Sequence, residues 1–157
     1  MYTPISNSDT IVTVYKTGRD ARGESSRNVR LNDVNDIRGL LSPVTDPGDK
    51  NELPLIMKRQ FDGRRRRENA SGRCLLVLDV DHSDGTEMAD ASSRMEDEGI
   101  PHLIYTTYSH TEELPRYRVV VPVTVENKHV YQHLAIEIFE IMQVDIAPES
   151  WAINSGF

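Results

Sequence analysis

The sequence predicts an α+β (mixed α/β) fold in which one sheet carries helices on one face. An uninterrupted apolar run at residues 74–80 is typical of a strand buried on both sides. The elements expected after that run are a helix, two strands, a second helix and a short strand, an order that favours a single sheet with packed helices. The length of 157 residues, with 38% hydrophobic and 27% charged residues, is sufficient to bury one proper core.

The first half of the chain contains fewer clear elements. Residues 10–15 are β-branched and aromatic and predict a strand, whereas residues 18–27 are polar and glycine-bearing and predict a loop. Asn32 is placed to cap a short helix, and the prolines within residues 43–54 indicate irregular structure.

The second half is more regular. Residues 86–98 predict a helix, and residues 102–108 and 117–123 predict two strands joined as a hairpin with a long connection. Asn127 can cap an amphipathic helix, and residues 144–146 form a last short strand. This order resembles the ferredoxin-like, or RNA-recognition-motif, arrangement.

Composition excludes several classes of protein. The net charge of −7 argues against a protein that coats duplex DNA without sequence preference. No apolar run approaches the roughly 20 residues that span a bilayer, so no membrane partner is expected. The single cysteine, Cys74, lies inside the apolar run and fits a buried free thiol in a reducing cytoplasm.

Two carboxylates stand where the apolar run ends, at Asp79 and Asp81. Side chains two apart on a strand share a face, so both carboxylates are expected on one side of the sheet. Paired carboxylates repel unless a cation lies between them, and hard oxygen ligands suit Mg²⁺ or Mn²⁺. The alternative is that the two aspartates cap the following turn.

Basic residues gather immediately before this strand, within residues 58–73. A solvated loop is the usual meaning of such a run. The other interpretation is a nucleic-acid or phosphate contact, because guanidinium groups bind phosphate in a bidentate manner. The residues proposed for this contact are Arg64, Arg65, Arg66 and Arg67.

Three stretches resemble the archaeo-eukaryotic primase superfamily, in particular the primase-polymerase domains of phage and plasmid replication proteins. Residues 76–81 look like its first motif, an apolar run into Asp-x-Asp. Residues 104–110 and 115–122 are similar to the hairpin that follows that motif in mobile-element members. Val144-Asp145 is similar to the apolar-acidic third motif.

The resemblance implies template-directed nucleotidyl transfer by a DNA primase or polymerase with two bound metals, Mg²⁺ or Mn²⁺. The carboxylates that would hold these metals are Asp79, Asp81 and Asp145. The hairpin would contact the phosphates of the incoming nucleotide, through Ser109, His110, Arg116 and Arg118. The family more often has Ser-x-His there, whereas this chain has adjacent Ser109 and His110, so which of these side chains binds phosphate stays open.

The expected partners are nucleoside triphosphates, a single-stranded DNA template and a helicase fused or encoded nearby. Residues 1–57 would be a variable N-terminal module packed on the core, and residues 58–157 the primase-polymerase-like core. The stretch after Asp145 leaves little room for the further strands of the family, so the core is expected to be shortened at its C-terminus.

Two other functions remain open. A non-catalytic nucleic-acid- or protein-binding module derived from the same fold would keep the acidic pair as a structural feature. A haloacid-dehalogenase-like phosphatase would use Asp79 as a nucleophile, since Asp79-x-Asp81 with Gly85-Thr86 superficially resembles its motif. The chain lacks that family's later lysine and paired aspartates.

Overall fold

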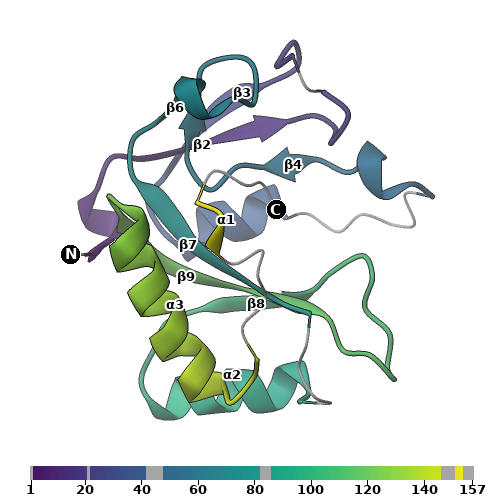
Figure 1. Cartoon of the computed structure of the whole chain (residues 1–157), viewed down its shortest axis with the longest axis vertical. Helices are drawn as coiled ribbons and strands as arrows, with labels where there is room; N and C mark the ends of the chain where they lie inside the picture. The colour runs from purple at the N-terminus through teal and green to yellow at the C-terminus, as the bar shows by residue number, and fades with distance from the viewer. Residues whose placement is uncertain (1, 21, 42–47, 82–85, 146–150, 154–157) are drawn as a thin grey trace.

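The structure, a computed structural model, describes residues 2–20, 22–41, 48–81, 86–145 and 151–153. Its fold is mixed α/β, as the sequence predicts (Figure 1). The helices are α1 (Val34–Leu40), α2 (Met88–Asp97) and α3 (Lys128–Met142), with short 3₁₀ turns η1 (Ile5–Asn7), η2 (Lys50–Glu52) and η3 (Arg67–Asn69). The strands are β1 (Tyr2–Pro4), β2 (Thr10–Tyr15), β3 (Arg27–Leu31), β4 (Leu55–Ile56), β5 (Gln60–Phe61), β6 (Ala70–Ser71), β7 (Cys74–Val80), β8 (Leu103–Thr106) and β9 (Tyr117–Val125).

The central sheet is built on β9. Along one side β9 pairs with β7, and along the other it pairs with β8 and, further on, with β1. All three pairings are antiparallel, so β7 and β8 run in the same direction with β9 between them. The segment β7-α2-β8-β9-α3 therefore has the split β-α-β order expected from the sequence.

One face of this sheet is covered by α2 and α3. Leu76, Leu78 and Val80 of β7 point to that face and pack against Met95 of α2 and Phe139 of α3. Asn127 caps α3 by accepting a hydrogen bond from the backbone N–H of Val130, as predicted. Arg94 of α2 donates to the carbonyl of Met142, which ties the two helices together.

The opposite face is covered by the N-terminal half of the chain. Leu75 and Val77 of β7 and Val120 of β9 pack against β2, β4 and α1. The strands β3, β2 and β4 form a second, three-stranded antiparallel sheet. Because β7 lies between helices and this second sheet, all seven of its residues are buried, which confirms the prediction from its apolar run.

The structure corrects several local predictions. Helix α1 is capped by Asp33, whose carboxylate accepts hydrogen bonds from two backbone N–H groups, rather than by Asn32. The short strands β3 to β6 are absent from the predictions. Val144 and Asp145 are not in a strand, because α3 ends with Gln143 in the left-handed conformation, and Ile146 lies outside the described residues. No helix within the described ranges is long and apolar enough to cross a membrane.

Candidate functional site

A row of polar side chains crosses the central sheet near the end of β7. In the strand register Asp79 of β7 lies opposite Arg118 of β9, and Arg118 lies opposite Tyr105 of β8. Residues two apart on a strand share a face, so Asp79 lies on the face of Val77, and Arg118 lies on the face of Val120. Tyr105 packs against the same cluster as these two valines. All three polar side chains therefore belong to the face turned away from α2 and α3. The sequence thus places a carboxylate, a guanidinium and a phenol side by side.

Asp79 and Arg118 form an ion pair, in which the Nε–H of Arg118 donates to Oδ1 of Asp79. The pair is largely shielded from water, with 11% of the Asp79 side chain and 20% of the Arg118 side chain exposed. Burial lowers the pKa of Arg118, but Asp79 and Tyr105 together raise it more, and the guanidinium stays charged. The negative charge of Asp79 is therefore balanced within the protein.

The carboxylates at the end of β7 are suitable ligands for a divalent metal ion. Asp81 directly follows β7 and is half-buried, so two carboxylates stand at the strand end. Mg²⁺ commonly uses one or two carboxylates together with water and substrate phosphates, and this pair fits that mode. Within the described residues no three His, Cys, Asp or Glu side chains gather as a metal site, so the exposed Asp145 does not join Asp79 and Asp81.

The hairpin between β8 and β9 carries the other predicted site residues. Its base is closed by the N–H of Thr107, which donates to the carbonyl of Arg116 at 3.0 Å. The backbone N–H of Arg116 in turn donates to Nδ1 of His110 at 3.1 Å, so His110 holds the turn together. Ser109 is exposed, and the Nε of Arg116 is buried with no hydrogen-bond partner among the residues that the structure describes.

Lys58, which the site prediction missed, is buried beside the edge of β7 that does not pair with β9. The carbonyl of Lys58 accepts from the N–H of Leu75 at 2.7 Å, and its Nζ donates to the hydroxyl of Tyr131 at 2.9 Å. That hydroxyl donates to the carbonyl of Val77. Burial lowers the pKa of Lys58 to about 8, an effect that the nearby Cys74 and Asp79 partly oppose. This role could not be predicted from the sequence, because Lys58 begins a basic run that is typical of a solvated loop.

The arginine run does not act as one surface. Arg65 lies 5.4 Å from the ring centre of Tyr15 and donates to the carbonyl of Gly18 at 2.8 Å. Arg64, Arg66 and Arg67 are exposed, and among the described residues an acid lies near Arg66 alone, Glu68 at 3.8 Å. Figure 1 shows β6 and the adjoining turn beside the start of β7, whereas Asp79 lies toward its other end. The run is thus separated from the carboxylates by the length of the strand.

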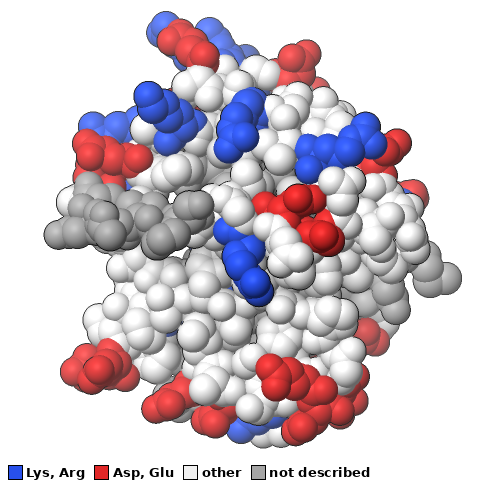
Figure 2. Space-filling view, turned by 180° about the vertical axis from the view of Figure 1, so that it is seen from behind, with Lys and Arg blue, Asp and Glu red and all other residues white. Residues whose placement is uncertain are grey.

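Acidic side chains concentrate elsewhere. Figure 2 shows mainly red atoms at the lower end of the molecule, where α2 lies in Figure 1, and most blue atoms in the upper half. On the face that Figure 2 shows, the basic side chains therefore lie mostly in the half that contains β2, β3 and β6. This separation permits local contact with a polyanion despite the net charge of −7.

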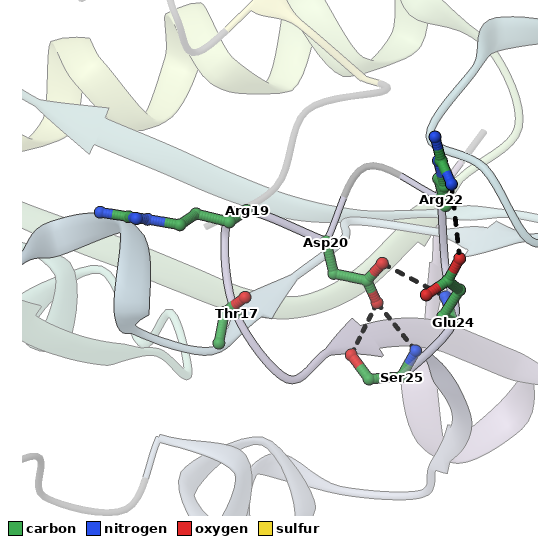
Figure 3. A pocket seen from close by; sticks show the side chains of 6 residues that line it. All are labelled: Thr17, Arg19, Asp20, Arg22, Glu24 and Ser25. Atoms are coloured by element: carbon green, nitrogen blue, oxygen red, sulfur yellow. Dashed lines mark hydrogen bonds and ion pairs between the residues drawn. The ribbon is translucent and has the colours of Figure 1, made fainter.

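An open depression of about 510 Å³ lies on the loop between β2 and β3 (Figure 3). Within it the carboxylate of Asp20 accepts hydrogen bonds from the backbone of Gly23, Glu24 and Ser25 and from the Ser25 hydroxyl. The Ser25 hydrogen bonds lower the pKa of Asp20 to about 2. The carboxylate thus shapes its own loop, and none of the predicted site residues lines the depression.

The split β-α-β sheet and its carboxylate–arginine row define an α+β domain with a polar site at one strand end. A family model, the VapE N-terminal domain, matches residues 57–151, which is more than half of the chain. The chain belongs to the VapE N-terminal domain family, which is associated with phage and plasmid replication. Searches of curated proteins and of solved structures found no match.

Proposed function

We propose that this chain is the catalytic core of a metal-dependent DNA primase-polymerase that acts in phage, plasmid or mobile-element replication. The observation that carries the proposal is that Asp79 on β7 and Arg118 on β9 share a sheet face, with Arg116 directly before β9. Nucleotidyl transfer needs carboxylates for metal and cations for a triphosphate at one place. The membership of the replication-associated family supports the same assignment.

In this proposal each group has a separate task. Asp79 and Asp81 would hold Mg²⁺ or Mn²⁺, which supplies charge neutralisation at the reacting phosphate. Arg116 and Arg118 would bind the triphosphate, with Ser109 and His110 on the adjoining turn as further phosphate contacts. Asp145, the third carboxylate that the resemblance implies, lies apart from Asp79 and Asp81 and is given no task at the metal.

The template would be single-stranded DNA held by the exposed arginines Arg64, Arg66 and Arg67. Such contacts are sequence-independent and weaken steeply as salt increases, because bound counterions are released. Arg65 is less suited to this task than its neighbours, since its guanidinium already binds the carbonyl of Gly18.

The experiment is a primer-synthesis reaction with Mn²⁺, labelled nucleoside triphosphates and a single-stranded DNA template. The variants are Asp81→Ala and Asp79→Asn, which keeps the shape of the residue at the ion pair. Labelled oligomers from the natural chain, and none from folded variants, are expected. Oligomers from both variants at the natural rate would contradict the assignment of the carboxylates.

A second candidate is a non-catalytic binding module of the same fold. The specific observation in its favour is that Arg118 already balances Asp79 while Asp145 lies apart. Such a module would bind single-stranded DNA with a steep salt dependence and would be unaffected by Asp81→Ala. Release of phosphate from a generic ester without a template would instead indicate a phosphatase.

A further inference from the structure

Two segments that are separate in the sequence hold most of the basic residues of this acidic chain. Residues 16–27 contain the loop between β2 and β3, and residues 58–73 contain β5, β6 and the loop between them. Together they hold 11 of the 18 lysines and arginines but 4 of the 25 aspartates and glutamates. Their formal charge is therefore +7 in a chain of −7, which favours a polyanionic partner at these segments.

The fold brings the two loops into backbone contact. Gly23 in the β2–β3 loop has a φ of +79°, and a Cβ atom there would lie 2.3 Å from the carbonyl oxygen of Gly63 in the β5–β6 loop. That carbonyl also accepts a hydrogen bond from the hydroxyl of Tyr15 at 2.7 Å. Arg65 adds a further link by donating to the carbonyl of Gly18 at 2.8 Å. The two loops therefore form one continuous surface.

An exposed arginine stands next to each of the two glycines. Arg22 directly precedes Gly23, and Arg64 directly follows Gly63. The Arg22 side chain is 74% exposed, and its acidic neighbour Glu24, at 3.9 Å, is exposed as well (Figure 3). Because an exposed ion pair contributes little, the guanidinium of Arg22 can bind another anion at small cost.

The chemistry of these side chains selects the ligand. A guanidinium offers N–H donors and no acceptor, and it binds phosphate oxygens through paired hydrogen bonds. Arginines from two loops occupy separate points of the surface, so they fit a ligand that repeats its negative charge along a chain. The backbone of a nucleic acid has this property.

We propose that the β2–β3 loop is part of the surface that binds single-stranded DNA, with Arg22 binding the template backbone beside Arg64. This inference rests on the proposed function, which assigns the template to the β5–β6 loop alone. The β2–β3 loop precedes residues 57–151, the segment that the family model matches. Template binding would therefore use the N-terminal half of the chain as well as the matched segment.

The test measures binding of a fluorescein-labelled thymidine oligonucleotide by fluorescence anisotropy over a series of salt concentrations, without metal or nucleotide. The variants are Arg22→Ala, Arg22→Lys, Arg64→Ala and the double change Arg22→Ala/Arg64→Ala. Arg30→Ala is the matched control, because Arg30 is also exposed and pairs with one acid, Asp9, but lies in β3 outside the two loops.

We expect Arg22→Ala to weaken binding about fivefold at roughly 0.1 M salt and to lower the logarithmic salt slope by about 0.7, the value for one phosphate contact on a single strand. Arg22→Lys should keep the natural slope because it keeps the charge. The double change should lower the slope by about 1.4, and Arg30→Ala should leave binding unchanged.

Natural affinity in Arg22→Ala, with weaker binding in Arg64→Ala, would overturn the inference and leave the proposed function intact. An equal loss in Arg30→Ala would indicate a general effect of net charge and would also overturn the inference. If the natural chain did not bind the oligonucleotide, the template contacts of the proposed function would themselves be wrong.

Discussion

Arginines near the two ends of β7 make different contacts; the course of this strand can be followed in Figure 1. Near its first residue, Arg59 and Arg73 donate to the backbone carbonyls of Gly72 and Thr124, and Arg65 donates to Gly18. Toward its last residue, Arg118 pairs with a carboxylate. The arginines near the first residue mainly donate to backbone carbonyls, and Arg73 also pairs with the exposed Glu126, whereas Arg118 pairs with a shielded carboxylate on a sheet face. The density of arginine in the sequence therefore does not locate the functional end.

The largest effect is expected at the carboxylate end. Asp79→Ala leaves Arg118 without its ion-pair partner in a shielded position, and we expect a loss of about 3–4 kcal/mol in the free energy of unfolding. Urea denaturation measures the loss. The double change Asp79→Ala/Arg118→Met should recover most of it, because a buried pair replaced by apolar groups costs little.

Asp81→Ala is the matched control for that prediction. Asp81 is half-buried and follows the strand, so its removal should cost less than about 1 kcal/mol. Equal losses in the free energy of unfolding for Asp79→Ala and Asp81→Ala would show that the broken ion pair is not the cause of the loss.

An intermediate effect on stability is expected at Lys58, beside the edge of β7 that does not pair with β9. Because burial lowers its pKa from 10.5 to about 8, the folded chain releases this proton while the unfolded chain retains it. The free energy of unfolding therefore rises between pH 8 and pH 10.5 by on the order of 2–3 kcal/mol from this residue. Lys58→Met should be more stable than the natural chain at pH 7, and that advantage should shrink across the same interval.

The comparison with Lys58→Met is needed because other groups oppose the trend. Burial raises the pKa of Cys74 to about 11 and that of Tyr131 well above 10, so both reduce stability as pH rises past their unfolded values. Both remain in the variant. Lys128→Met, at an exposed position, is the matched control for the removal of a lysine charge. A constant difference for Lys58→Met would contradict the prediction.

The smallest effect is expected within the arginine run. Arg65→Ala removes the contact with Tyr15 and the hydrogen bond to Gly18, at a cost of about 1–2 kcal/mol. Arg64→Ala should stay within about 0.5 kcal/mol, because the side chain is exposed.

Binding of single-stranded DNA should show the opposite order. Arg64→Ala removes one expected phosphate contact and lowers the salt dependence of binding by about 0.7 in the logarithmic slope. Arg65→Ala should change the slope less. If Arg64→Ala and Arg65→Ala had equal effects on both stability and DNA binding, the distinction between structural and exposed arginines in this run would be wrong.

Much of the fold around β7 could be predicted because its elements have strong local signals. The apolar run of β7, the cap at Asn127 and the alternation in the hairpin each give an element its type, and these elements appear at nearly the predicted positions. The two-residue strands β4 to β6 could not be predicted. They are too short for periodicity, and their pairing depends on distant partners such as β2.

The candidate site was predictable in part. The position of Asp79 and Arg118 on one face follows from strand periodicity and hairpin pairing, but their ion pair requires the register between β7 and β9. Tyr105 carried no signal, since a tyrosine in a strand is common in cores. The role of Lys58 depends on Tyr131, which is 73 positions away in the sequence.

The pairing of β1 with β9 joins the first residues of the chain to the segment that the family model matches. The family match begins at Met57, yet Tyr2–Pro4 supply a strand to the same sheet that carries Asp79, and the N-terminal half covers Leu75 and Val77. The segment that the family model matches is therefore smaller than the unit that folds. A matched segment moved into another protein would need a new strand to pair with β9 and new apolar residues to bury Leu75 and Val77.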